Sequence, residues 1–200
     1  MKKLFVCLFL ILKGGVIQKM VEPPFLIDGH RFSIRIYAAV TQLNPIRVYL
    51  SSSFFLVLIA MGNPNDINEE SGFISNFHYQ QEFNHLHAGN LAQYLLSRGK
   101  LNRWVEYSLP LMGRGLKEFF ANEGMYEGDS GGRYFELLGC DVILDSSLTP
   151  HFLECNRCAT SFVVSGREQT ISLEELLYIV LYESETDGEI PQNLHYWQPF

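Results

Sequence analysis

The sequence predicts an α+β fold in which a mainly antiparallel sheet is flanked by helices. Strand-like alternation and apolar runs recur in residues 31–60 and again in residues 134–156. Helical periodicity lies between these two regions, in residues 90–123, and returns in residues 172–183. The chain has 200 residues, of which 47% are hydrophobic and 18% are charged. This composition is typical of a globular protein with one sizeable core.

The first predicted strands follow one another in the amino-terminal third of the chain. Residues 16–21 are rich in β-formers and end before a pair of prolines, and Asp28-Gly29 signals a turn. Residues 31–40 alternate, so we expect a strand with two different faces. The apolar face carries Phe32, Ile34 and Ile36, and the other face carries Arg31, Ser33, Arg35 and Tyr37. Further β-type runs follow in residues 46–60.

The middle of the chain predicts a long connection and then helices. Residues 62–90 show little periodicity, and irregular connections of this length are usually functional or mobile. Residues 90–123 have helical spacing, but Pro110, Gly113 and Gly115 fall within them. Because proline and glycine interrupt helices, we expect at least two helices here.

The last third predicts two strands, one helix and a tail. Residues 134–156 read as two strands with a turn near residues 146–150. In the amphipathic segment that follows, Ser172 and Glu175 have the spacing of a capping box, which predicts a helix beginning at Ser172. Residues 186–200 are predicted to form an irregular tail.

Charge and cysteine content exclude some functions. The net charge of −7 argues against nucleic acid as a partner, since phosphate binding needs clustered Lys and Arg. The densest basic stretch, residues 98–117, is interpreted as a solvated helix face. The four cysteines are too few for a disulfide scaffold. Cys155 and Cys158 form a C-x-x-C with no second pair to complete a zinc site, so we expect reduced thiols in an intracellular protein.

The first 15 residues allow two interpretations. Two lysines, an apolar run and a Gly-Gly pair are typical of a secretory signal, but the same run also fits a buried strand. The run is too short to cross a bilayer, so no stable membrane span is expected.

The two strands of residues 134–156 carry the clearest chemical signal. If they pair antiparallel, Asp141 comes close to Glu154 and Asn156. Simple alternation also places Phe152 on the same face as these last two residues. Two carboxylates and an amide are oxygen donors of the kind that Mg²⁺ prefers. The sequence therefore indicates a magnesium–nucleotide site, with ordinary surface residues on an exposed sheet face as the alternative.

Three stretches together resemble the tubulin tyrosine ligase-like family, most closely its polyglutamylase branch. They are "VIQKMVEPPFLIDGHRFSIRIYAAVTQLNPIRVYL", "FELLGCDVILD" and "FLECNRCATSF". The resemblance implies an ATP-grasp-like fold in residues 16–185, without that fold's amino-terminal lobe. It also implies an ATP- and Mg²⁺-dependent ligase that adds an amino acid, glutamate above all, to tubulin or another acidic chain. Such an enzyme would work in the cytoplasm, on the cytoskeleton or in a cilium.

The resemblance also implies roles for individual residues. Arg35 matches an arginine that faces the reacting phosphates, and we take it as the catalytic residue. The magnesium ligands are expected to be Asp141, Glu154 and Asn156. The expected nucleotide-binding residues are Gln18, Lys19, Met20, Val21, Arg31, Ser33, Ser75 and Asn76.

Several positions depart from the family pattern. Ser33 stands where the family has an aspartate, and Leu58 falls where it has a substrate-binding arginine. Phe73 replaces a histidine, and one extra residue follows Asn156. These departures keep open an inactive pseudoenzyme that binds nucleotide or microtubules. The signal-like first residues keep open a secreted or membrane-attached protein that is not an enzyme.

Overall fold

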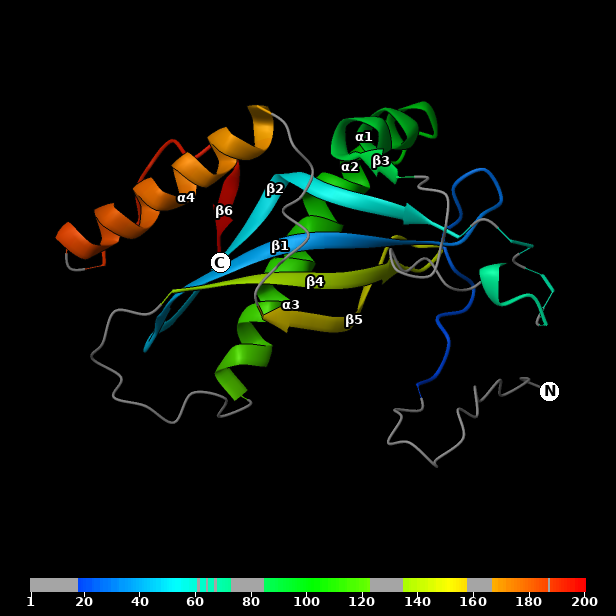
Figure 1. Cartoon of the computed structure of the whole chain (residues 1–200), viewed down its shortest axis with the longest axis horizontal. Coiled ribbons are helices and arrows are strands. Elements are labelled where there is room, and N and C mark those ends of the chain that lie inside the picture. The colour runs from blue at the N-terminus through cyan, green and yellow to red at the C-terminus, as the bar shows by residue number, and fades with distance from the viewer. Residues whose placement is uncertain are drawn as a thin grey trace.

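The computed structural model describes residues 18–60, 62–63, 65–66, 68–72, 85–122, 135–157, 167–186 and 188–200. Within them the strands form one six-stranded sheet in the order β3-β2-β1-β4-β5, with β6 pairing β2 (Figure 1). Every strand pair is antiparallel. The strands are β1 (Phe32–Leu43), β2 (Ile46–Ile59), β3 (His85–His87), β4 (Glu136–Leu144), β5 (Pro150–Arg157) and β6 (Trp197–Pro199). The predicted α+β class and antiparallel sheet are confirmed.

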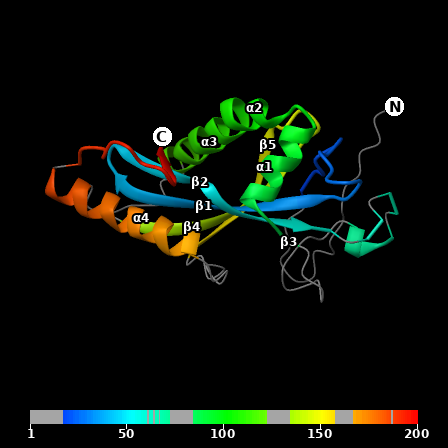
Figure 2. The same ribbon diagram turned by 90° about the horizontal axis from the view of Figure 1, so that it is seen from above.

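Helices cover both faces of this sheet. The helical elements are η2 (Glu70–Gly72), α1 (Ala88–Ser97), α2 (Leu101–Arg103), η3 (Trp104–Ser108), α3 (Leu109–Asn122) and α4 (Arg167–Glu185). Figure 2 shows α1, α2 and α3 on one side of the sheet and α4 on the other. Among the described residues, no helix combines the length and the apolar character needed to cross a membrane.

The alternation in β1 divides the core between the two faces of the sheet. Ile34 and Ile36 point toward α1 and α3 and are fully buried in the larger core cluster. Tyr37 and Ala39 belong to a second cluster on the α4 side. The predicted two-faced strand is therefore confirmed. Because both faces of the sheet are covered here, every residue of β1 is buried or half-buried.

The interruption in the helical region lies earlier than the sequence predicts. Gly99 has a φ of +65°, which glycine adopts without strain, and it separates α1 from α2. The chain is then helical through Pro110, because η3 is a π-type turn in which Leu109 N–H bonds to the Trp104 carbonyl. The expectation of at least two helices is confirmed, but the expectation that Pro110, Gly113 and Gly115 interrupt them is wrong, because all three lie inside α3. Gly113 has a packing reason, since a Cβ there would lie 2.3 Å from the Phe200 ring.

The carboxyl-terminal helix and tail also differ from expectation. The helix α4 begins at Arg167, so Ser172 is a buried interior residue and the predicted capping box is wrong. The Glu175 carboxylate instead accepts backbone N–H bonds from His195, Tyr196 and Trp197 at 2.7, 2.7 and 3.0 Å. These bonds fix β6 beside β2, where we expected an irregular tail.

Candidate metal and nucleotide site

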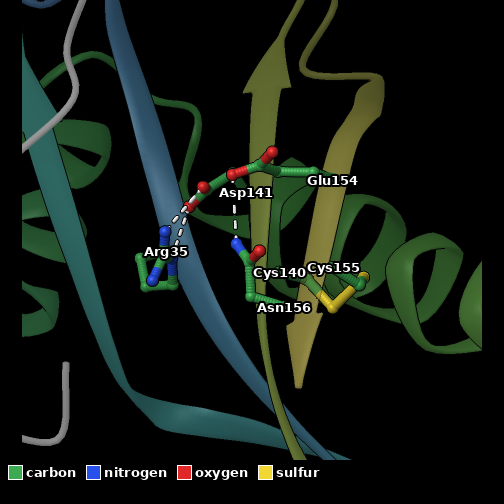
Figure 3. Close-up of a disulfide and its surroundings, with 6 residues drawn as sticks. All are labelled: Arg35, Cys140, Asp141, Glu154, Cys155 and Asn156. Carbon is green, nitrogen blue, oxygen red and sulfur yellow. Dashed lines mark hydrogen bonds and ion pairs between the residues drawn. A yellow bond between two sulfur atoms is a disulfide. The ribbon is translucent and has the colours of Figure 1, made fainter. Parts of the chain in front are cut away.

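Three charged residues form one row across the middle of the sheet. Arg35 of β1 lies directly opposite Asp141 of β4, and Asp141 lies directly opposite Glu154 of β5. Directly opposite residues share a face of an antiparallel sheet, and here that face is the one away from α1 and α3. Asn156 occupies the next row, opposite Gly139. The structure thus brings together the four residues that the sequence singled out (Figure 3).

A β-bulge decides which face Glu154 occupies. Val142 pairs with Phe152 while the adjacent Asp141 pairs with Glu154, so Leu153 is an extra residue on β5. Phe152 packs into the larger core cluster, and the extra residue turns Glu154 to the opposite face. The prediction that Phe152 shares a face with Glu154 is wrong, because simple alternation does not account for a bulge.

The row is held by a bidentate ion pair. Arg35 Nε donates to Asp141 Oδ1 at 2.5 Å, and Arg35 Nη2 donates to Asp141 Oδ2 at 2.7 Å. The two side chains are only 17% and 15% exposed. Hydrogen bonding to Asp141 raises the pKa of Arg35, against the opposing effect of burial. On the same face, burial raises the pKa of Tyr37 to about 12 despite the nearby Arg35 charge. The site therefore keeps one fixed positive charge beside a carboxylate.

Glu154 and Asn156 form the exposed side of the site. Asn156 Nδ2 donates to Glu154 Oε1 at 3.0 Å, and both residues are exposed to solvent. The amide oxygen of Asn156 is the atom that could serve as a ligand, because an amide nitrogen only donates hydrogen bonds. Arg35 thus lies at the covered end of the row, and the oxygen donors lie at the open end.

The donor set fits a hard divalent cation. Two carboxylates and one amide oxygen suit Mg²⁺, which commonly completes its shell with waters or phosphate oxygens. Arg35 already contacts both Asp141 oxygens, so a cation would share Asp141 with the guanidinium or displace it. In the described part of the chain, no group of three His, Cys, Asp or Glu side chains is placed to hold a metal. A cation here depends on Asn156 and on ligands from a bound molecule.

The other predicted nucleotide contacts lie at several places. Gln18 and Lys19 are exposed, whereas Met20 and Val21 are half-buried. Arg31 forms an ion pair with Glu22 at 2.5 Å.

Ser33 is buried two residues from Arg35, on the same face, with Leu58 opposite on β2. Ser75 and Asn76 lie outside the described residues. Ser33 is thus the member of this group that lies beside Arg35, one row further along β1 on the same face.

A disulfide behind the row is the feature that the sequence did not reveal. Cys140 and Cys155 are directly opposite on β4 and β5, with Cα atoms 4.0 Å apart, and they form a disulfide. Both contact the larger core cluster, on the face away from Glu154. The expectation of reduced, uninvolved cysteines is wrong for this pair. Sequence spacing gave no signal for it, because the pairing depends on the strand register; the C-x-x-C drew attention to Cys158 instead.

Comparisons with known proteins point to one family. A model of the "Tubulin-tyrosine ligase family" matches residues 12–184. The chain is 27% identical to the probable tubulin polyglutamylase TTLL9 of Mus musculus over 187 residues, covering 87% of this chain and 40% of that protein. It is 23% identical to the tubulin polyglutamylase TTLL6 of Mus musculus over 192 residues, covering 83% and 23%.

A relative named for a different activity has a similar level of identity. The protein polyglycylase TTLL10 of Macaca fascicularis is 24% identical over 162 residues, covering 72% of this chain and 25% of that protein. The chain therefore spans from about a quarter to two fifths of the length of these relatives.

Proposed function

Because this chain belongs to the tubulin-tyrosine ligase family, we propose that it serves an ATP- and Mg²⁺-dependent ligation of an amino acid to a protein chain. Tubulin or another acidic protein is the proposed acceptor, and the cytoplasm, cytoskeleton or cilium the proposed location. The row formed by Arg35, Asp141 and Glu154, with Asn156 beside it, is the observation that carries this proposal.

Glutamate is the proposed amino acid. Two of the relatives above are named as polyglutamylases, one of them as a probable one, and the third is named as a polyglycylase. The resemblance of the motifs to the polyglutamylase branch favours glutamate over glycine.

The residues of the site divide into two proposed roles. Asp141, Glu154 and Asn156 would hold Mg²⁺ with the nucleotide phosphates, and the ion would supply charge neutralisation. Arg35 would stabilise negative charge that develops on the reacting phosphate oxygens. Its buried pairing with Asp141 keeps the guanidinium charged and oriented.

The remaining predicted residues would bind the nucleotide. The backbone of residues 18–21 would border the adenine, and Arg31, Ser33, Ser75 and Asn76 would contact the rest of the nucleotide. A ligation of this kind asks little covalent chemistry of the protein. It requires that a carboxylate and an amine be positioned and that charge be neutralised.

One observation favours a second candidate, nucleotide binding without ligation. Leu58 lies opposite Ser33 on the face that carries Arg35. The family resemblance predicts an arginine at that position to hold the carboxylate of the incoming amino acid. An apolar side chain removes that charge, while the row of proposed metal ligands stays intact.

Glu154→Gln tests the proposed function directly. We expect Mg²⁺-dependent ATP affinity, measured by calorimetry, to be abolished because a carboxylate ligand is lost. The free energy of unfolding should change by no more than about 0.5 kcal/mol, since Glu154 is exposed. Glu174→Gln, an exposed glutamate on α4, is the matched control. Unchanged nucleotide affinity in Glu154→Gln would refute the assignment of the metal ligand.

Incorporation of labelled glutamate into tubulin separates the two candidates. ATP-stimulated incorporation that is lost in Glu154→Gln supports the ligase. ATP binding that is lost in Glu154→Gln, without any incorporation of glutamate by the wild type, supports the nucleotide-binding alternative.

A further inference from the structure

The proposed metal ligands Glu154 and Asn156 lie on an edge strand of the sheet. β5 is at the edge of the sheet and pairs only with β4 among the described strands. Two of its side chains, Phe152 and Cys155, pack against the core cluster. An ion pair between Arg157 and Glu136 also joins the two strands at 3.1 Å, but Arg157 is 62% exposed, and such pairs contribute little.

Register matters more here than elsewhere in the sheet. A slip of one residue moves every side chain of a strand to the other face. The bulge at Leu153 places Glu154 opposite Asp141, and removing this extra residue would turn Glu154 toward the core. The geometry of the site therefore depends on holding β5 in one register next to a bulge.

The disulfide joins the two strands at the level of the ligands. Cys140 precedes Asp141, and Cys155 lies between Glu154 and Asn156. The cysteines point to the core face while the ligands point to the opposite face, so the covalent bond holds the backbone from which the ligands project. Its position ties the register to the three pairs Gly139–Asn156, Cys140–Cys155 and Asp141–Glu154.

We propose that the Cys140–Cys155 disulfide positions Glu154 and Asn156, and that its reduction lowers the affinity of the site for a divalent cation. This inference rests on the proposed function, because it takes the row as a cation site. Cys140 and Cys155 are positioning residues, since they act through the ligands beside them. Partners of this kind typically change metal affinity by about 10–100-fold.

Thiol–disulfide exchange with a small thiol, RSH, links the site to the redox state of its surroundings. Cys140 is fully buried and Cys155 only partly buried, so the thiol attacks the Cys155 sulfur. This forms a mixed disulfide at Cys155 and leaves Cys140 as a thiol. A second RSH attacks the outer sulfur, releases RSSR and leaves Cys155 as a thiol. Two RSH thus become RSSR while the disulfide becomes two cysteine thiols. In a reducing compartment, disulfides of this kind are usually redox-responsive.

Binding of Mn²⁺ alone tests the proposal. The purified full chain is prepared oxidised, or reduced and freed of reductant under nitrogen, and free Mn²⁺ is followed by electron paramagnetic resonance. We expect the Kd for Mn²⁺ to rise by about tenfold or more on reduction. A loss of stability alone leaves the Kd of the folded protein unchanged. The measurements are therefore made well below the melting temperature of both forms, where both are folded.

Three variants serve as controls for the redox effect. Cys155→Ala should bind Mn²⁺ as weakly as the reduced protein and should not respond to reductant. Cys158→Ala should keep the full response, because it removes the C-x-x-C while leaving the Cys140–Cys155 pair. Glu154→Gln should remove binding in both redox states. If Cys155→Ala does not fold, the comparison of oxidised and reduced wild type decides the question.

The outcomes separate this inference from the proposed function. Equal Kd values in the two redox states, with binding that still requires Glu154, overturn the inference and leave the proposed function standing. Absence of Glu154-dependent Mn²⁺ binding in both states overturns both. Peptide mapping that finds Cys155 bonded to Cys158 also overturns the inference.

Discussion

Two arginine–carboxylate pairs lie on the same face of the sheet, and their surroundings give them different roles. Arg35 pairs with Asp141 at 2.5 Å, and Arg47 pairs with Glu183 at 2.8 Å. All four side chains are at most 17% exposed. Neither distance nor burial therefore distinguishes the two pairs.

The pair at the end covered by α4 is held by a third residue. Tyr49 donates its hydroxyl to the same Glu183 oxygen that Arg47 contacts, at 2.6 Å. Burial raises the pKa of Tyr49 well above its usual range, and the Glu183 hydrogen bond raises it further. Two donors on one carboxylate oxygen join α4 to β2, so this pair stabilises the docking of a helix.

The pair at the other end is continued by polar groups instead. Glu154 lies next to Asp141 in the row, and Glu154 and Asn156 are exposed. An accessible carboxylate beside a paired one is available to a ligand. The next residue in the row, rather than the ion pair itself, therefore separates a structural pair from a candidate site.

Glu183→Gln should produce the largest loss of stability at the covered end. It leaves Arg47 as a buried cation without its carboxylate, and breaking a buried pair in this way typically costs about 3–5 kcal/mol. The free energy of unfolding is measured by urea denaturation. Cation binding at Glu154 should be unchanged in the folded variant.

Glu185→Gln is the matched control for this substitution. It removes an exposed glutamate from the same helix and should change stability by no more than about 0.5 kcal/mol. A cost below about 1 kcal/mol for Glu183→Gln would show that the covered pair is not structural, and the contrast between the two ends would fail.

Asp141→Asn should have a smaller effect on stability and a complete effect on binding. Asparagine, like glutamine at position 183, keeps one acceptor, but Glu154 remains near Arg35 as a second carboxylate. We therefore expect a smaller loss, of about 1–3 kcal/mol. Mn²⁺ binding should disappear, as in Glu154→Gln, whose stability is unchanged. If the variant loses stability and still binds Mn²⁺ with wild-type affinity, the Arg35–Asp141 pair has only a structural role, like the Arg47–Glu183 pair.

Sequence reasoning anticipated the contents of the open end better than its geometry. Alternation in β1 placed Arg35 on the face opposite Ile34 and Ile36, and turn-forming residues placed Asp141 beside Glu154. These features follow from local periodicity and turn chemistry. The bulge at Leu153 does not, because it depends on how β5 packs Phe152 against the core.

The covered end was less predictable because its interactions join distant parts of the chain. Ser172 and Glu175 have the spacing of a capping box, yet Glu175 binds backbone groups about 20 residues further on. Trp197 is 1% exposed and completes the cluster with α4. The contacts of Glu175 with residues 195–197 outweighed the local capping-box pattern, and no short-range pattern in the sequence predicts β6.

Acid should act on the open end through its turn, and this is the smallest effect we predict. Asp145 accepts backbone N–H bonds from Ser147 and Thr149, both at 2.9 Å, and contacts the His151 ring at 3.3 Å. Burial alone would raise the pKa of Asp145, but the hydrogen bond from Thr149 and then the contacts with His151 and Ser147 lower it. The folded pKa is thus below the unfolded value of about 3.9.

The sign of the pH dependence follows from this lowered pKa. A carboxyl group with a depressed folded pKa contributes stability above its unfolded pKa and loses that contribution as the pH falls through the folded pKa. Asp145→Asn keeps an acceptor oxygen, so we expect it to cost about 1 kcal/mol at pH 7. The difference in unfolding free energy between wild type and variant should shrink as the pH falls from about 5 to about 3, because this range contains the unfolded Asp pKa of about 3.9. Urea denaturation at these pH values measures it, with Glu189→Gln as an exposed control. A difference that stays constant from pH 7 to about pH 3 would mean that the Asp145 charge does not stabilise the turn that sets β5 beside β4.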